Sequence, residues 1–464
     1  MTTFQSRPDQ LDLADSLDER ETTIRPEGLL DLARSRGRHG ASPVGSMTDR
    51  AARATVHGLL SKMTSSKLVI DERLAGQPAE RLSFGPDAAD DRSDLDHLEA
   101  TITVTDGRAY RAVALEGSVG LGRGYLESWW DSDDPVAVVR MIIHNLEPVD
   151  EFRNRLAQNT GWLTDRVRRV LPRRGRRRNR EDIASHYDLG NDFFRIFLDE
   201  TLTYSSAVFP SAEAALAEAS HHKYDRLLAK LGVTADHRVL EIGTGWGGMA
   251  LRTVDTTGAK VTTTTISSEQ LAEARHRVHR AGRHDDVTLL SEDWRDLEGR
   301  FDRVVSIEMI EAVDWRDYDR YFATIERCME PTGLAAIQAI CVPDRRYERT
   351  KNTEDFIRRF IFPGGFLPSI GAVTRSVSRA TRMQVIDVED FSAHYAETLR
   401  RWRERFDERI DEVHALGLDE RFCRLWRFYL AYCEAGFLER HCTVNQFVIA
   451  GRHWRPDGLE LRAT

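Results

Sequence analysis

A glycine-rich run between positions 239 and 248 is the part of the sequence best suited to chemistry. It reads Val-Leu-Glu-Ile-Gly-Thr-Gly-Trp-Gly-Gly, the pattern of a buried strand that ends in a turn and opens a helix. Glycine at Gly243, Gly245 and Gly247 lets the backbone adopt positive φ and lets a ligand approach without meeting a Cβ atom. The run therefore predicts a cradle for a nucleotide cofactor.

The residues around this turn indicate which nucleotide it holds. A P-loop requires Gly-Lys-Ser/Thr, which is missing here. Glu241 lies two positions before the first glycine, where its carboxylate would repel phosphate but suit the cationic amino-acid head group of S-adenosylmethionine. We expect S-adenosylmethionine as the cofactor, with Glu241 as the acceptor for its amino group or as an organiser of the turn. A glycine turn without a ligand is the simpler alternative.

The region around the turn has the pattern of an α/β fold with a doubly wound parallel sheet. Short apolar runs alternate with amphipathic segments from position 238 onward. Ligands bind such sheets beyond the carboxyl ends of the strands, and polar residues gather at those ends. The expected strands are 239–242, 260–266, 287–290, 301–307 and 333–340, and the polar residues are Ser267, Gln270, Glu292, Asp293, Trp294, Glu308, Glu311 and Gln338.

The chain of 464 residues allows two to three domains. Residues 1–50 lack hydrophobic periodicity and predict a disordered tail. Residues 51–160 predict a small α+β domain, with a helical stretch near 50–63, alternating strands, and a glycine-rich run over 120–131 that predicts turns. A basic linker over 161–182 then leads to the domain that contains the cofactor sheet, residues 183–464.

Charge is distributed unevenly along the chain. The formal net charge of −9 argues against a nucleic-acid partner. Nine arginines and no acidic residue lie between Arg166 and Arg180. Such a block is either a solvated segment or a contact for anionic lipid head groups, where each arginine contributes on the order of 1 kcal/mol.

The five cysteines show no CxxC spacing, so they predict reduced core residues and no metal site. The sequence also lacks a run of about 18 apolar residues and a basic-then-apolar signal pattern at its N-terminus. We therefore expect a cytoplasmic protein that is at most peripheral to the inner face of the cell membrane.

Three further runs, together with the glycine turn, resemble the cyclopropane-fatty-acid synthase family of methyltransferases. They are His-Tyr-Asp-Leu-Gly-Asn-Asp-Phe-Phe at 186–194 with Leu-Asp-Glu-Thr-Leu-Thr-Tyr-Ser at 198–205, Ser-Ile-Glu-Met-Ile-Glu-Ala-Val at 306–313, and Phe-Ile-Phe-Pro-Gly-Gly-Phe-Leu-Pro-Ser at 360–369. The resemblance is strong over about 180–450. It implies a Rossmann-like methyltransferase domain, a smaller N-terminal lipid-binding domain, and a phospholipid bilayer surface as partner. A homodimer remains open.

The resemblance implies transfer of a methylene group from S-adenosylmethionine across a cis double bond of phospholipid acyl chains. An isolated alkene is a weak nucleophile, so the reaction needs an electrophilic methyl group, a dry apolar slot and tolerance of a carbocation. Aromatic faces contribute about 1 to 2 kcal/mol of cation–π attraction in a desolvated site. The candidates, each of which is also a plausible core residue, are Tyr204, Phe360, Phe362, Tyr395 and Trp402.

By the same resemblance, a bicarbonate ion acts as the base, bound by a cysteine, a glutamate, a histidine, a backbone position and a tyrosine. Glu311 and Tyr395 match two of these positions, and Ile340 matches the backbone position. Ser206 stands where cysteine is common, and Gln338 stands where some members have histidine. Both keep the pocket polar, but neither carries the positive charge of an imidazolium, which lowers the expected anion affinity.

The fate of the cation determines the product. Direct proton loss from the transferred methyl gives a cyclopropane, whereas a preceding hydride shift gives a 10-methylene chain, the precursor of a 10-methyl chain. From the sequence we favour the cyclopropane, with the methylene-branched chain as the alternative. A small-molecule methyltransferase and a catalytically inactive membrane-binding protein are further alternatives, and intact Glu241, Glu311 and Tyr395 argue against the last.

The resemblance also assigns further cofactor contacts. Thr265, Ser267 and Gln270 are expected to contact the cofactor after the second strand, although Ser-x-x-Gln is also a pattern that begins helices. Two further pairs have expected roles: Asp293 and Trp294 frame the adenine, and Tyr204 and Ser205 close over the methionine part. His186 is expected to orient or cap a helix rather than to catalyse.

Overall fold

The computed structural model describes residues 47–64, 66–86, 98–145, 189–351 and 353–456. Residues 1–46 of the predicted tail, the basic linker and His186 lie outside the described residues. The helices are α2 (Met47–Leu60), α3 (Arg108–Glu116), α4 (Ser118–Leu126), α5 (Pro135–His144), α9 (Asn191–Phe197), α10 (Leu216–Leu231), α11 (Gly248–Thr257), α12 (Ser268–Arg280), α13 (Tyr318–Cys328), α14 (Asp344–Thr350), α15 (Phe356–Phe360), α16 (Ile370–Ala380), α17 (Ser392–Glu408), α18 (Ile410–Ala415) and α19 (Glu420–Leu438).

The strands form two separate sheets. A four-stranded sheet has the order β2-β1-β3-β4, and a seven-stranded sheet has the order β10-β11-β9-β8-β5-β6-β7. The strands are β1 (Ser66–Glu72), β2 (Glu80–Phe84), β3 (Leu98–Val104), β4 (Trp130–Asp131), β5 (Arg238–Ile242), β6 (Lys260–Thr264), β7 (Val287–Leu290), β8 (Phe301–Ile307), β9 (Met329–Cys341), β10 (Gln384–Asp390) and β11 (Thr443–Ala450). In the larger sheet β5 to β9 run parallel, and β11 runs antiparallel to both of its neighbours, β9 and β10. The predicted α/β fold with a parallel, Rossmann-like sheet is confirmed.

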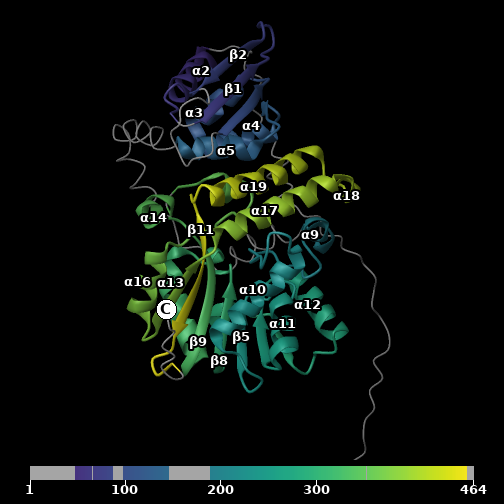
Figure 1. The fold of residues 1–464 in the computed structure, drawn as a ribbon, viewed down its shortest axis with the longest axis vertical. Helices are drawn as coiled ribbons and strands as arrows, with labels where there is room; N and C mark the ends of the chain where they lie inside the picture. The colour runs from purple at the N-terminus through teal and green to yellow at the C-terminus, as the bar shows by residue number, and fades with distance from the viewer. Residues whose placement is uncertain (1–46, 65, 87–97, 146–188, 352, 457–464) are drawn as a thin grey trace, which may run out of the picture.

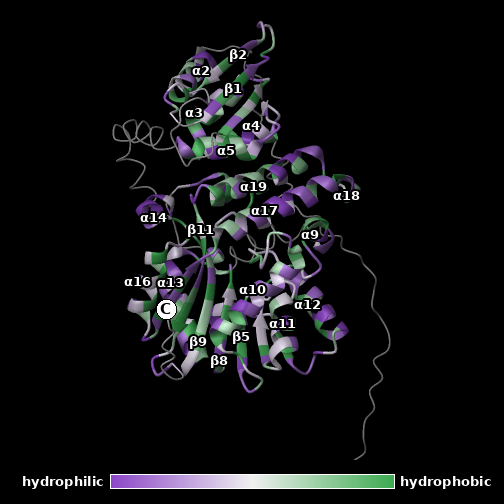
Figure 2. Cartoon of the chain, viewed as in Figure 1, coloured by the Kyte–Doolittle hydropathy of each residue, from purple (hydrophilic) through white to green (hydrophobic). Residues whose placement is uncertain are grey.

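Helices cover both faces of the larger sheet (Figure 1). Leu240 and Ile242 share a core with α13 and α16, whereas Val239, which precedes Leu240 and faces the other side of the sheet, packs with α10 and α11. Strands buried on both faces are apolar along their whole length, and Figure 2 shows the central strands as hydrophobic beside more hydrophilic helices. None of the helices in the described ranges has the length and the apolar run that crossing a bilayer requires.

Four strand boundaries differ from the prediction. β5 begins at Arg238 rather than at 239, and β9 begins at Met329 rather than at 333. β6 ends at Thr264 rather than at 266, because the next residues begin α12: Gln270 N donates to Ser267 Oγ at 3.3 Å, and Thr265 Oγ1 donates to Gln270 Oε1 at 3.0 Å. β9 extends to Cys341 because β11 pairs with it in antiparallel register up to the Thr443–Cys341 pair. The strands predicted at 287–290 and 301–307 are confirmed.

The glycine-rich run over 120–131 forms the helix α4 over most of its length, so the prediction of turns was wrong. The glycines serve close packing instead. A Cβ atom on Gly120 would lie 1.9 Å from the Ala112 carbonyl oxygen, and one on Gly122 would lie 2.1 Å from the Phe356 ring. Gly122 therefore lets α4 approach α15 without steric conflict. Here the smaller lobe is the part that contains the four-stranded sheet, α2 to α5 and β1 to β4, and the larger lobe is the described part from residue 189 onward, which contains α15.

Arg424 on α19 holds the smaller lobe against the larger one. Its guanidinium donates to the Tyr125 carbonyl oxygen at 2.7 Å and to Asp131 Oδ2 at 3.1 Å. It also lies 4.0 Å from the centre of the Tyr125 ring, and that ring stacks on Phe428. Figure 1 shows the smaller lobe next to α19, and α17 packs against α19. The helix α17 carries Tyr395, one of the expected catalytic residues, so this junction supports the helix that positions Tyr395.

The substitution Gly120→Ala tests the packing role of α4. The added methyl group would meet a backbone carbonyl, which cannot rotate away, so we expect a loss of about 1 to 3 kcal/mol in unfolding free energy. Urea unfolding measures this loss. The matched control is Gly58→Ala, since nothing lies within 4 Å of a Cβ there and alanine favours a helix. Equal stability of the two variants would contradict the packing role.

Candidate active site

The glycine turn follows β5 at the carboxyl edge of the larger sheet. Gly243, Gly245 and Gly247 have φ values of 105°, 52° and 86°, a region that side chains rarely adopt. The backbone N–H groups of Gly243 and Thr244 both donate to the Thr264 carbonyl oxygen, at 3.1 and 3.0 Å. This bond pair fixes the turn against β6, and the glycines keep its outer surface free of Cβ atoms.

Glu241 lies buried just before the turn. Burial raises the pKa of Glu241 to about 8, although a hydrogen bond with Thr263 and the charge of Lys223 both lower it. Its Oε2 atom is buried and has no hydrogen-bond partner among the described residues. A buried carboxylate oxygen without a partner is costly, so a cationic group bound here would be stabilised. The site therefore fits the amino group of S-adenosylmethionine.

The other expected cofactor residues lie at neighbouring strand ends. Ser267 caps α12, and Gln270 bonds with Thr265, so the helix-start interpretation of this motif describes its geometry. Asp293 caps the short helix at 294–296 and pairs with Arg295 at 2.9 Å. Trp294 is buried in the core that contains α13. The cofactor roles of these residues remain predictions.

Tyr204 and Ser205 lie in the loop after α9. The Tyr204 hydroxyl bonds with that of Tyr429 at 2.9 Å, and the two rings of Tyr204 and Trp402 lie 5.4 Å apart. Ser205 Oγ accepts a hydrogen bond from Lys223 Nζ at 2.6 Å. Lys223 is fully buried, and burial lowers its pKa to about 8. The charges of Glu308, Asp199 and Glu241 oppose this shift.

Four of the expected catalytic residues converge on two glutamates, Glu308 and the fifth expected residue, Glu311. Glu308 accepts three hydrogen bonds: Oε1 from Ser206 N at 2.9 Å and from Gln338 Nε2 at 2.8 Å, and Oε2 from the Tyr395 hydroxyl at 2.7 Å. Glu311 Oε1 accepts from Ile340 N at 2.6 Å. The structure thus brings Ser206, Gln338 and Tyr395 to one carboxylate and Ile340 to the other.

The two carboxylates differ in their surroundings. Burial raises the pKa of Glu311 to about 8, and the nearby charge of Glu308 raises it further. Its Oε2 has no hydrogen-bond partner among the described residues. Burial also raises the pKa of Glu308, but Lys223 and the three donors lower it. Lys223 and the three donors thus favour the charged form of Glu308, whereas burial and the charge of Glu308 favour the protonated form of Glu311.

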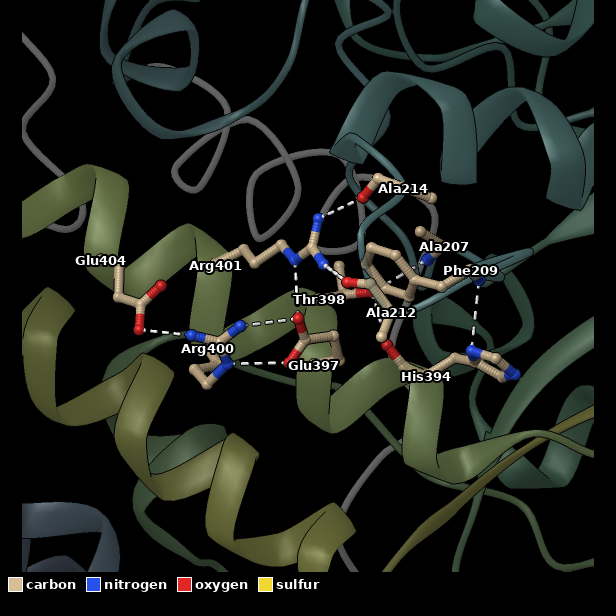
Figure 3. Close-up of polar contacts among 10 residues, drawn as sticks. All are labelled: Ala207, Phe209, Ala212, Ala214, His394, Glu397, Thr398, Arg400, Arg401 and Glu404. Atoms are coloured by element: carbon tan, nitrogen blue, oxygen red, sulfur yellow. Dashed lines mark hydrogen bonds and ion pairs between the residues drawn. The ribbon is translucent and has the colours of Figure 1, made fainter.

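Side-chain contacts tie the loop that carries Ser206 to α17, which carries Tyr395 (Figure 3). Ala207 N donates to Thr398 Oγ1 at 3.1 Å, and Phe209 N donates to His394 Nδ1 at 3.2 Å. Farther along the loop, Arg401 donates to the carbonyl oxygens of Ala212 and Ala214. These bonds fix the distance between the loop and α17, and thereby between the two groups that hold Glu308.

The cofactor turn lies against the segment that carries both glutamates. A Cβ atom on Gly243 would lie 3.3 Å from Met309 Cγ, and Met309 lies between Glu308 and Glu311 in the chain. Glu308 and Glu311 each keep some accessible surface although they lie deep in the protein. The segment that carries both carboxylates is therefore adjacent to the cofactor turn.

Sequence analysis placed Glu308 among the polar residues at strand ends without a specific role, and it did not single out Lys223. Glu308 stands at the carboxyl end of a predicted strand, and that position was the available signal. Lys223 occurs within the amphipathic helix α10 and is buried, and no motif marked it. Its importance depends on contacts with residues that are distant in the sequence.

A family model and a similar curated protein both show which family the chain belongs to. A family model described as mycolic acid cyclopropane synthetase matches residues 174–447. Tuberculostearic acid methyltransferase UfaA1 of Mycobacterium tuberculosis is 42% identical over 346 residues, which cover 73% of this chain and 80% of that protein. The chain belongs to the mycolic acid cyclopropane synthetase family.

Two further relatives support this membership. Cyclopropane-fatty-acyl-phospholipid synthase of Escherichia coli is 33% identical over 365 residues, which cover 76% of this chain and 88% of that protein. The structure of mycolic acid cyclopropane synthase CmaA1 complexed with SAH and CTAB matches with a TM-score of 0.55 and 31% identity, over 58% of this chain and 98% of that one. The family resemblance in the sequence is confirmed, and this family member is an S-adenosylmethionine-dependent methyltransferase.

The buried carboxyl of Glu311 predicts a pH-dependent stability of the cofactor-free enzyme. Its pKa is raised from 4.5 to about 8 in the folded state. The stabilisation that this group contributes is therefore complete below about pH 4.5 and is lost as the pH rises through about 8. In Glu311→Gln we expect a smaller fall in unfolding free energy between about pH 5 and 8, by up to about 1.4 kcal/mol per pH unit.

Urea unfolding at several pH values measures this difference. The matched control is Glu298→Gln, a change at an exposed glutamate, which should leave the pH dependence as in the wild type. If Glu311→Gln and the wild type lose stability in parallel over this range, Glu311 does not hold a proton in the folded enzyme.

Proposed function

We propose that this enzyme transfers the methyl group of S-adenosylmethionine to a cis double bond in an acyl chain of a membrane phospholipid. The main support is that Glu308 and Glu311 flank Met309, whose side chain lies at the cofactor turn, and that Glu308 bonds with Tyr395, which packs near Trp402. The methyl donor supplies an electrophilic carbon. A proton must then leave the methylated chain, and the carboxylates give that proton a nearby acceptor.

In this proposal the backbone of the glycine turn contacts the cofactor directly. Gly243, Gly245 and Gly247 admit it without side-chain contact, and Glu241 accepts a hydrogen bond from its amino group. Further contacts come from the residues expected at the neighbouring strand ends and in the loop after α9: Thr265, Ser267, Gln270, Asp293, Trp294, Tyr204 and Ser205.

Aromatic side chains beside the carboxylates suit an alkene that becomes a cation. Tyr204 and Tyr395 flank Trp402, with ring centres 5.4 and 6.3 Å from it. Phe362 lies 6.1 Å from Tyr429, the partner of the Tyr204 hydroxyl. Such rings exclude water and attract positive charge. Phe360 packs on Phe356 instead, toward the smaller lobe.

A phospholipid substrate is supported by the E. coli relative, whose name specifies a fatty-acyl-phospholipid. In our proposal residues 51–160 contact the bilayer surface, and the basic linker at 161–182 binds anionic head groups. The enzyme would then act at the inner face of the cell membrane. A homodimer is compatible with this arrangement.

Two products are compatible with this chemistry. The E. coli relative and the family model support the cyclopropane, which the sequence favours. The 42% identical relative is named as a methyltransferase of tuberculostearic acid, which supports the methylene-branched alternative. Because that identity is higher than the 33% of the E. coli synthase, we take the methylene-branched chain as the first candidate and the cyclopropane as the second.

Incubation with methyl-deuterated S-adenosylmethionine and vesicles of monounsaturated phospholipid tests the proposal. We expect acyl chains that retain two of the three deuterium atoms, because one leaves as the proton. Mild hydrogenation before mass spectrometry separates the products, since a methylene group takes up hydrogen and a three-membered ring does not. Vesicles with saturated chains are the control. Absence of deuterium from the unsaturated chains would refute the proposed function.

A further inference from the structure

The Glu308 carboxylate is surrounded by hydrogen-bond donors in the way that a bound anion would be. Its carboxylate lies among the Ser206 N–H, the Gln338 amide and the Tyr395 hydroxyl, all within 2.9 Å. Gln338 is oriented for this contact, because its Oε1 accepts from Gln446 Nε2 at 3.1 Å and its Nε2 therefore faces Glu308. Each of these groups presents a proton to the carboxylate, as in a site for an anion.

The backbone at Glu308 is strained to achieve this placement. Its φ is +49°, in the left-handed region, which is unfavourable for a residue with a side chain. Glu308 N also donates to the Gln338 carbonyl oxygen at 2.8 Å. Strain of this kind persists where surrounding contacts overdetermine it, and it concentrates at functional sites.

The bicarbonate expected from the family resemblance does not fit these residues. That expectation assigned the ion to the positions of Ser206, Gln338 and Tyr395, together with Glu311 and the Ile340 backbone. In the structure the first three donate to Glu308, and Ile340 N donates to Glu311. The donors are already bonded to side-chain carboxylates, and a second anion beside them would be repelled.

We propose that Glu308 is the proton acceptor of the reaction, a carboxylate of the chain itself in place of a separate bicarbonate ion. The inference rests on the proposed function, methyl transfer to an alkene. Lys223 and the three donors favour the charged form of Glu308 against the burial that raises its pKa, whereas burial and the charge of Glu308 raise the pKa of Glu311 to about 8 and favour its protonated form. The pair thus offers one base next to one neutral acid.

The step balances with Glu308 as the only base. The alkene electron pair forms the bond to the methyl carbon, while the carbon–sulfur bond breaks and its electrons stay on sulfur. The neighbouring carbon becomes cationic. Glu308 then takes one proton from the transferred methyl, and that C–H electron pair closes the ring or, after a hydride shift, forms the methylene double bond. The proton later passes from Glu308 to solvent, which restores the carboxylate.

Two variants distinguish the ability of the Glu308 side chain to accept a proton from the space that it fills. Glu308→Gln keeps the size of the side chain but cannot accept the proton. Glu308→Gly removes the side chain and suits the positive φ, so it should fold, and it leaves the three donors free for an added anion. The matched control is Glu408→Gln, an exposed glutamate at the end of α17.

The first arm of the test measures anion binding without turnover. Thermal unfolding is followed in CO2-free buffer with sodium bicarbonate, sodium formate or matched sodium chloride. We expect Glu308→Gly to gain about 2 °C or more in Tm from bicarbonate or formate over chloride. The wild type and Glu408→Gln should show no such gain. A gain in the wild type as large as in Glu308→Gly would overturn the inference.

The second arm measures turnover on monounsaturated phospholipid vesicles. Wild-type turnover should not change when bicarbonate is removed. Glu308→Gln should lose about 100-fold or more in kcat with unchanged binding of S-adenosylhomocysteine. Glu308→Gly should be equally slow, and bicarbonate or formate should restore it at least about tenfold. Wild-type turnover that depends on bicarbonate, or an active Glu308→Gln, would overturn the inference.

The two arms distinguish this inference from the proposed function. A wild-type enzyme that leaves the vesicles unmethylated would refute the proposed function and, with it, the role of Glu308 as the base of that reaction. The anion-binding arm would still decide whether the Glu308 carboxylate fills the anion site. A methylating wild type with an active Glu308→Gln would leave the function standing and remove Glu308 from it.

Discussion

The hydrogen bonds of the Glu308 carboxylate are the interaction on which the site depends. They join three segments that lie 102, 30 and 87 residues away in the sequence: the loop after α9, strand β9 and helix α17. Each segment is held by its own support, namely the loop by α17, β9 by β8 and β11, and α17 by α19. The helix α19 also contacts the smaller lobe through Arg424. A continuous series of contacts therefore runs from the smaller lobe through α19 and α17 to the Glu308 carboxylate.

Buried charge is the second constraint on this region. Glu241 and Glu308 lie within the electrostatic reach of the fully buried Lys223. Charges removed from water are costly unless they are paired or hydrogen-bonded. Lys223 and a few hydrogen-bond donors offset part of the cost of burying these carboxylates. One oxygen of Glu241 and one of Glu311 have no hydrogen-bond partner among the described residues. The Glu241 oxygen lies just before the cofactor turn, where a cationic group would be stabilised, and the Glu311 oxygen belongs to a carboxyl whose protonated form is favoured by burial and by the charge of Glu308. The site is thus prepared electrostatically before the ligands bind.

Much of this architecture could be predicted from the sequence, because its signals are local. The strand at 301–307 and the turn at Gly243 follow from periodicity and from glycine chemistry, and the residues around the carboxylates follow from the family motifs. The helix α4 could not be predicted, because its glycines reflect contacts with Ala112 and Phe356 rather than turns. The role of Glu308 was also hidden, since the motif gives the residue type at a strand end but not its three donors. Lys223 looks like any other residue of an amphipathic helix until the fold buries it.

A crystal structure of the enzyme with S-adenosylhomocysteine, grown in the presence of sodium bicarbonate, tests the central claim most directly. The account predicts the Glu308 carboxylate between Ser206 N, Gln338 and Tyr395, with no separate planar anion on those three donors. A bicarbonate ion bound to Ser206, Gln338 and Tyr395, with the Glu308 side chain turned away from them, would contradict it.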